Sequence, residues 1–74
     1  MSEEIKTRLA TIVAPYRREV WLDAVQFESG MRLLRVTIKE GRRFTQLDLD
    51  AETADQWGEA MKGWAQRSRQ GQSG

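Results

Sequence analysis

The chain has 74 residues, of which 39% are hydrophobic and 31% are charged, and its 12 basic and 11 acidic residues nearly cancel. This composition is typical of one small folded domain and argues against wholesale binding to nucleic acid or to an anionic membrane. The absence of cysteine and histidine excludes disulfides, thiolate nucleophiles, imidazole bases and the usual zinc or iron ligand sets. No apolar run approaches the ~20 residues that span a bilayer and no signal-peptide core is found, so we expect a cytoplasmic protein without cofactor or metal.

The first segment of the chain is predicted to be a helix. Ser2 supplies a capping hydroxyl, and Glu3 and Glu4 place acids in the first turn, where they complement the unpaired amides and the helix dipole. Apolar side chains then recur at helical spacing, at Ile5, Leu9, Ile12 and Val13. Pro15 removes a hydrogen-bond donor and disfavours helical geometry at the preceding residue, so this helix is expected to end near Val13.

Two antiparallel strands are predicted next, joined by the three-residue loop Glu28-Ser29-Gly30, in which the glycine supplies a left-handed conformation. This loop sets Phe27 opposite Met31 and thereby fixes the register. Apolar residues then meet on one face, in the pairs Ala24–Leu34, Leu22–Val36 and Val20–Ile38. Opposite charges meet on the other face, in the pairs Asp23–Arg35 and Glu19–Lys39. The agreement of apolar and charged pairs supports this hairpin.

A third strand is predicted after a second hairpin turn. The alternation of apolar residues requires a loop of even length here. A two-residue turn at Glu40-Gly41 would set Lys39 opposite Arg42, and a four-residue loop from Lys39 to Arg42 would avoid that repulsion. Both loops give the same strand pairing, Leu34 with Leu47 and Val36 with Thr45.

The last segment is predicted to be an amphipathic helix that begins after the N-cap residue Asp50. From Ala54 its apolar stripe consists of Trp57, Met61, Trp64 and Ala65. We expect the two tryptophans to be core anchors against the sheet, with stacking on a ligand as the alternative. Gly58 and Gly63 each cost ~1 kcal/mol relative to alanine, which indicates either a weak helix or a close approach of another backbone.

Together these segments predict an α+β fold in which a three-stranded antiparallel meander lies between an N-terminal and a C-terminal helix. Residues 1–69 are expected to form a single domain, and residues 70–74 a disordered polar tail. The core face of the sheet is lined by Val20, Leu22, Ala24, Leu34, Val36, Ile38, Leu47 and Leu49. The outer face carries six large apolar side chains, Trp21, Val25, Phe27, Met31, Leu33 and Phe44.

The outer face is too apolar to be solvated, and a sheet only ~10–15 Å wide cannot hold two helices on one face. Three arrangements satisfy this constraint. One helix covers each face of a monomer, or two copies join their outer faces or exchange their first helices in a homodimer, or the face docks another protein or a stack of nucleic-acid bases. We predict a non-enzymatic interaction module that self-associates or docks a protein partner through the outer face.

The alternative function is the binding of single-stranded nucleic acid. Cations lie near aromatic rings on the outer face, and single-strand binders use this combination to hold phosphates and bases. The candidate residues are Trp21, Arg35, Lys39, Arg42 and Phe44. Three acids, Glu19, Asp23 and Asp48, share the face and cancel much of its charge.

No catalytic or metal-binding motif is found. Asp48, Asp50, Glu52 and Asp55 occur close together, but they lack the spacing and the central glycine of a calcium loop. The predicted connections are too short to form a pocket, so we expect no enzyme. The basic runs at residues 17–18 and 42–43 are expected to be solvated surface.

The element order also invites a comparison. A curved strand meander followed by a helix that begins in the segment LDLDAETA, residues 47–54, resembles the half-unit of dimeric single-strand-binding transcriptional coactivators. The resemblance covers the meander and the C-terminal helix. It implies a dimer and a sheet surface for nucleic acid, whereas those proteins usually show a more basic sheet.

Overall fold

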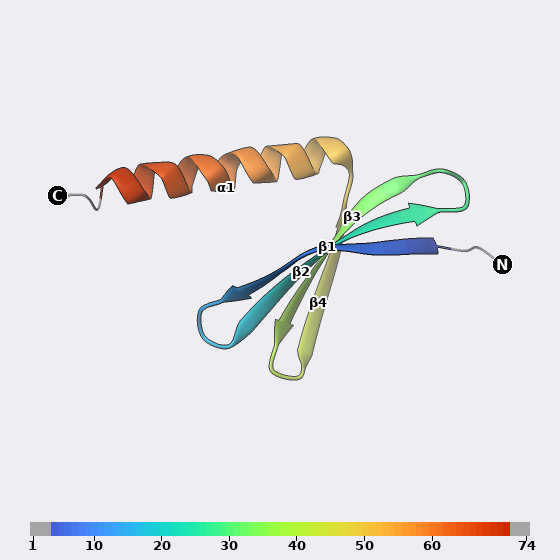
Figure 1. The fold of residues 1–74 in the computed structure, drawn as a ribbon, viewed down its shortest axis with the longest axis horizontal. Helices are drawn as coiled ribbons and strands as arrows, with labels where there is room; N and C mark the ends of the chain where they lie inside the picture. The colour runs from blue at the N-terminus through green and yellow to red at the C-terminus, as the bar shows by residue number, and fades with distance from the viewer. Residues whose placement is uncertain (1–3, 72–74) are drawn as a thin grey trace.

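The chain forms a four-stranded antiparallel sheet followed by one helix in the computed structural model, which describes residues 4–71 (Figure 1). The elements, in sequence and spatial order, are β1 (Glu4–Ala14), β2 (Arg18–Phe27), β3 (Arg32–Glu40) and β4 (Arg43–Leu49), followed by α1 (Ala51–Gly71). The predicted α+β class, with an antiparallel sheet before a C-terminal helix, is confirmed. The predicted three-stranded sheet between two helices is wrong, because the first segment is a strand.

A β-bulge in β1 explains why its sequence resembles a helix. β1 pairs with β2 in one register up to Arg8 and in a register shifted by one residue from Ala10, which leaves Leu9 at the bulge. Ile5 and Ile12 are an odd number of positions apart, so a regular strand would place them on opposite faces, but the shift places them on the same face. The two-residue period of a strand is therefore lost. The segment is rich in β-branched residues, which favour a strand, and β1 covers what would otherwise be an exposed edge of β2. The predicted cap residues 2–3 lie outside the described residues.

A tight turn of Pro15, Tyr16 and Arg17 joins β1 to β2. Tyr16 and Arg17 have φ angles of 64° and 61°, in the left-handed region that is uncommon for residues other than glycine. Pro15 therefore follows the end of a strand, not the end of a helix. The turn sets Ala14 opposite Arg18 and brings two arginines to this end of the sheet.

The predicted pairing of β2 with β3 is confirmed. The register contains all five predicted pairs, apolar on one face and oppositely charged on the other. The Phe27 N–H donates to the Met31 carbonyl at 2.9 Å, and the Gly30 N–H donates to the Phe27 carbonyl at 2.9 Å. Gly30 has the predicted positive φ, 94°. The loop length therefore determines this register.

The pairing of β3 with β4 differs from the predicted register by two residues. The turn consists of Gly41 and Arg42, and the pairs are Glu40–Arg43, Ile38–Thr45, Val36–Leu47 and Leu34–Leu49. A shift of two residues keeps every side chain on its predicted face. It also removes the repulsive pair of Lys39 and Arg42, because Glu40 now lies opposite Arg43 at the turn. The shift sets Arg35 opposite Asp48.

Helix α1 begins at the predicted cap. The Thr53 N–H donates to the Asp50 carboxylate at 2.8 Å, and this hydrogen bonding to Thr53 lowers the pKa of the Asp50 carboxyl. Figure 1 shows that α1 then runs past the sheet, not across it. It includes Gln70 and Gly71, and the rest of the expected tail, residues 72–74, lies outside the described residues.

The expected packing of α1 on the sheet is wrong. None of the described residues of α1 is buried; Trp57 is 44% exposed and Trp64 is 66% exposed. Among the described strands, α1 contacts β3 and β4, at the end where the chain leaves the sheet. The two tryptophans therefore do not anchor the core of this chain.

The buried residues lie on both faces of the sheet. Val36 and Leu49 are buried on the predicted core face. Asp23, Val25 and Thr37 are buried on the outer face, although α1 does not cover that face. Their neighbours on adjacent strands therefore cover them, and the outer face is more closed by its own side chains than its sequence indicates.

Candidate interaction surfaces

An apolar stripe runs along α1 and is exposed. Its residues alternate at spacings of three and four, which places them on one side of a helix, and we call Ala54, Trp57, Met61, Trp64 and the polar Ser68 the helix stripe. The three large apolar members are exposed, and Ala54 and Ser68 are half-buried. Met61 is 66% exposed, as is Trp64. An open hollow of about 490 Å³ lies along the stripe and is lined by Ala60, Met61, Trp64 and Ala65.

Small residues flank the helix stripe on both sides. With 3.6 residues per turn, Gly58 and Ala65 fall on one side and Thr53 and Ala60 on the other. Charged residues occupy the opposite side of the helix, including Glu52, Asp55, Glu59 and Lys62. A surface of large apolar side chains between small ones is typical of a helix that packs closely on another element.

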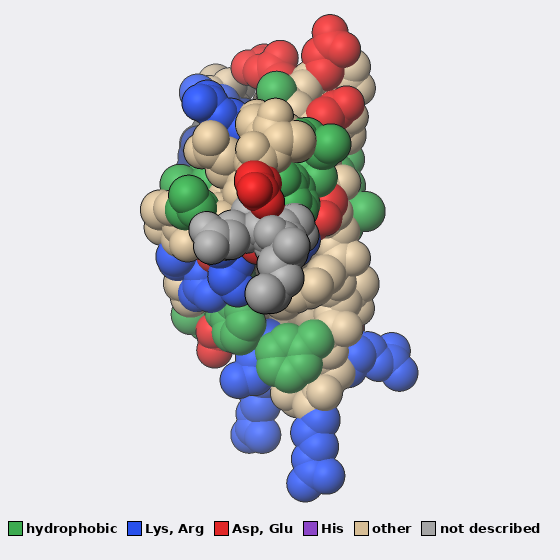
Figure 2. Space-filling model, turned by 90° about the vertical axis from the view of Figure 1, so that its right-hand side faces the viewer, with side chains coloured by type: hydrophobic (Ala, Val, Ile, Leu, Met, Phe, Trp, Pro, Cys, Tyr) green, Lys and Arg blue, Asp and Glu red, His purple; other side chains and the backbone are tan. Residues whose placement is uncertain are grey.

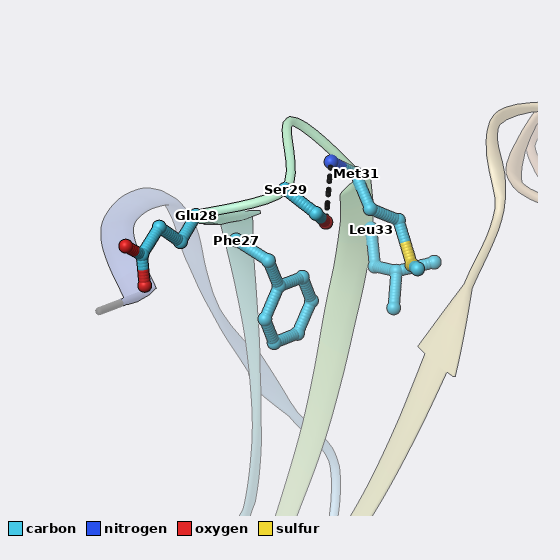
Figure 3. Close-up of a pocket in the computed structure, with 5 residues that line it drawn as sticks. All are labelled: Phe27, Glu28, Ser29, Met31 and Leu33. Atoms are coloured by element: carbon cyan, nitrogen blue, oxygen red, sulfur yellow. Dashed lines mark hydrogen bonds between the residues drawn. The ribbon is translucent and has the colours of Figure 1, made fainter. Parts of the chain in front are cut away.

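A second apolar surface lies at the β2–β3 hairpin. Phe27, Met31 and Leu33, with Glu28 and Ser29, line an open hollow of about 570 Å³. Figure 3 shows the three apolar side chains gathered on one side of the loop, with Glu28 directed away from them. The Met31 N–H donates to the Ser29 hydroxyl at 3.4 Å. The fold thus brings together three of the six predicted interface residues.

The other three interface residues lie in the middle and at the far end of the outer face. Trp21 and Phe44 contact each other, with ring centroids 5.8 Å apart, and Arg8 lies over the Trp21 ring at 4.8 Å. The Trp21 indole N–H donates to Glu19 at 2.9 Å. Val25 is 1% exposed and cannot contact a partner. The predicted interface is therefore divided into two separate apolar regions.

Ion pairs occupy the surface between these regions. The Arg8 guanidinium donates to the buried Asp23 carboxylate at 2.6 Å. Arg35 donates to both Asp48 oxygens, at 2.9 and 3.2 Å, and reaches across β2 to Glu4 at 3.2 Å. Hydrogen bonding to Arg35 lowers the pKa of the Asp48 carboxyl, and the pKa of Arg35 is raised, chiefly by its hydrogen bond to Asp48. Arg35, a candidate for nucleic-acid binding, is thus already paired within the chain.

The two other cationic candidates lie at the end of the sheet that carries the β1–β2 and β3–β4 turns. Ala14, Arg18, Glu40 and Arg43 form one row across all four strands, so these turns are neighbours. We call Arg17, Arg18, Lys39, Arg42 and Arg43 the basic end. Figure 2 shows Lys and Arg side chains projecting from the lower end of the molecule, whereas most of the Asp and Glu side chains in this view lie in the upper half, together with some Lys and Arg side chains. Within residues 4–71, Arg18 is the member of the basic end that forms a salt bridge, with Glu40 at 2.6 Å.

Exposed aromatic rings accompany the basic end. Tyr16 is 85% exposed and lies 6.0 Å from the Arg18 guanidinium, and Phe44 is 54% exposed and pairs with Lys39. The sequence pattern does not single out Tyr16 or Arg17 as functional residues, because Pro15 favours the end of a helix at this point. The β-branched composition of β1 was the signal that could have identified the turn.

Sequence comparison supplies the family. A model for a family of unknown function, DUF6967, matches residues 3–67. This chain belongs to that family. The match covers all four strands and most of α1, so the helix stripe from Ala54 to Trp64 is part of the DUF6967 domain and Ser68 lies just beyond the match. Searches of the curated proteins and of the solved structures found no match.

Two further findings bear on partners of the DUF6967 chain. Among the described residues, no helix combines the length and the apolarity needed to cross a lipid bilayer. The same part of the chain contains no group of three or more acidic, histidine or cysteine side chains placed to hold a metal ion.

Proposed function

We propose that this protein is a non-enzymatic interaction module that works as a self-associated assembly, with α1 as the associating surface. The observation that carries the proposal is the amount of surface that one copy leaves exposed. The chain exposes 6416 Å². A compact monomer of 8.6 kDa exposes about 4,700 Å², so about 1,700 Å² is in excess.

The dimensions of the chain support the same proposal. Its radius of gyration is 15.1 Å, whereas a compact domain of this length has one of about 11 Å. A stable protein interface removes about 800 Å² from each partner. The excess of a single copy is therefore sufficient for a complete interface.

The position of the apolar side chains favours α1, and not the outer sheet face, as the associating surface. Ion pairs and the Trp21–Phe44 contact close the middle of the outer face. The helix stripe has no such cover, and its three largest members are each at least 44% exposed. Exposed apolar surface of this extent usually marks an interaction site.

Tryptophan quenching together with sedimentation tests the proposal. In a Trp21→Phe variant, which keeps an aromatic ring against Phe44, the fluorescence reports only Trp57 and Trp64. We expect iodide to quench these tryptophans poorly at micromolar concentration and more strongly on dilution, in step with a fall in sedimenting mass. A chain that sediments as a monomer at every concentration, with both tryptophans fully quenched, would contradict self-association.

A second candidate function, the binding of single-stranded nucleic acid, is favoured by the basic end. Lys39 and Arg42 lie there beside Arg17, Tyr16 and Phe44, and their charges are not neutralised by ion pairs within residues 4–71. Cations beside exposed rings provide phosphate contacts and stacking surfaces. Trp21 is less suited to this role, since Phe44 and Arg8 already contact its ring.

Fluorescence anisotropy with a labelled single strand tests the second candidate. We expect binding that weakens steeply with salt, and an Arg42→Glu variant that binds less tightly at every salt concentration. Lys62→Glu is the matched control, because it makes the same change of charge on the outer side of α1. Equal loss in both variants would indicate a general charge effect and no site at the basic end.

A further inference from the structure

We infer that the occupant of the helix stripe is α1 of a second copy, packed antiparallel about a two-fold axis close to Met61. This inference rests on the proposed self-association and specifies which surface of the partner copy covers α1. The helix stripe extends from Ala54 to Ser68, and Met61 is its midpoint. An antiparallel pair centred there covers the whole of one stripe with the whole of the other.

The distribution of side-chain size along α1 fits this register. With Met61 opposite itself, Trp57 of one copy lies level with Ala65 of the other, and Trp64 lies level with Gly58. Each large ring therefore lies level with a small residue on the flank of the partner's stripe, and within one residue's rise of the partner's other tryptophan, with which it can stack. The hollow that Ala60 and Ala65 border provides space for a partner side chain. A parallel pair would instead set each tryptophan level with the same tryptophan of the partner copy.

Gly58 gives an independent reason for a close neighbour. A Cβ atom at this position would meet nothing within 4 Å in the single chain, so no contact of the chain requires glycine here. Glycine in a helix interior nevertheless costs ~1 kcal/mol relative to alanine. A second helix that packs against this side of the stripe requires a small residue at position 58, and this requirement explains why glycine occurs there.

Charge and shape also favour the antiparallel arrangement. Glu52, Asp55 and Glu59 lie in the first half of α1, and Lys62, Arg67 and Arg69 lie in the second half. Most of these charges lie on the side of α1 away from the helix stripe, but antiparallel pairing sets the acidic half of one helix level with the basic half of the other and opposes the helix dipoles. A helix of 21 residues is about 31 Å long, so the two sheets lie at opposite ends of the pair and do not collide.

Charge substitutions at Met61 test this inference. Two glutamates introduced by Met61→Glu would face each other across the axis, so we expect the variant to sediment as a monomer. Because Met61 is 66% exposed in a single copy, the fold itself should be unchanged by circular dichroism. Gln66→Glu is the matched control on the opposite side of α1 and should remain associated.

Mixing two variants then tests the position of the axis. Met61→Glu and Met61→Lys should each be monomeric alone and should form a one-to-one dimer together, because position 61 of one copy faces position 61 of the other. Two monomeric variants that do not associate when mixed would overturn the axis at Met61. Self-association that survives Met61→Glu would overturn helix pairing and leave the proposed function intact, whereas a monomeric unsubstituted chain would overturn both.

Discussion

Strand β3 and helix α1 illustrate two different ways in which a segment of this chain is stabilised. β3 lies between β2 and β4, and its Val36 and Thr37 side chains are buried by residues of the same sheet. α1 is longer and carries two tryptophans, yet none of its described residues is buried. Neighbouring strands bury β3 within one copy, whereas the apolar side of α1 is left exposed and can be covered only by a second molecule.

This comparison predicts that residues of the two regions respond differently to protein concentration. A residue that the sheet buries should contribute the same stability at all concentrations. A residue of the helix stripe should contribute only where copies associate, since binding that favours the folded state stabilises it by mass action. Four substitutions or conditions separate these cases, in order of expected effect.

The largest effect is expected for Leu49→Ala. Leu49 is 6% exposed at the point where β4 meets α1, and truncation of a buried leucine costs about 2–5 kcal/mol. Urea denaturation should show this loss of unfolding free energy at both low and high protein concentration. A loss confined to high concentration would place Leu49 in an interface between copies and not in the core of one copy.

Trp64→Ala is expected to act mainly on association. Truncation of a central tryptophan of an interface costs about 2 kcal/mol or more, which corresponds to at least about a 30-fold rise in dissociation constant. Sedimentation equilibrium measures this change. At concentrations where the chain is dissociated, Trp64→Ala should change the unfolding free energy little, because the Trp64 side chain is 66% exposed in a single copy. A large loss in the dissociated chain would show instead that Trp64 packs within one copy.

Gly58→Ala should have opposite effects on the helix and on association. Alanine raises the intrinsic stability of a helix by up to ~1 kcal/mol over glycine, but its Cβ would enter the space where a second helix approaches. We expect a more stable dissociated chain and a weaker assembly. Gly63→Ala is the matched control away from the helix stripe, where the added Cβ would meet only the flexible Arg67 guanidinium at 3.2 Å. Tighter association of Gly58→Ala would contradict close packing at this position.

The smallest effect on the unfolding free energy is expected when the pH is lowered. Hydrogen bonding to Arg35 lowers the pKa of Asp48, so the unfolded chain binds the proton more readily than the folded chain. The contribution of this pair is present above the unfolded pKa of about 3.9 and is lost as the pH falls through the lower folded value. For a partly exposed ion pair the loss is below about 1 kcal/mol. Urea denaturation between about pH 5 and pH 2 should show this loss, and Asp48→Asn should remove it.

Much of the sheet could be predicted from local residues. The three-residue loop ending in Gly30 determined the register of β2 and β3, and Asp50 identified the start of α1, because both signals act within a few residues. The alternation of apolar residues could not identify β1, because the bulge at Leu9 removes it, and only the β-branched composition of the segment indicated a strand. The β3–β4 register was wrong by two residues, since a shift of two keeps the apolar residues on the same face.

The candidate site was predicted in part. The sequence predicts the apolar side of α1, with Trp57, Met61, Trp64 and Ala65, but assigns it to the core, because a helical apolar stripe is the same whether a sheet or a second copy covers it. It also placed Arg35 among the residues open to nucleic acid. The contact of Arg35 with Glu4 depends on β1, which was predicted as a helix, so this ion pair could not be anticipated.

Local sequence patterns suffice to predict which residues share a face of β2, β3 and β4, where α1 begins, and which side of α1 is apolar, because these properties depend on the period of each element and on residues close in the chain. The fourth strand formed by the first segment and the extension of α1 beyond the sheet are features of the folded chain that no local apolar period predicts. Those outcomes depend on contacts between segments far apart in the sequence, where the free edge of β2 and the path of the chain after Leu49 outweigh local preference.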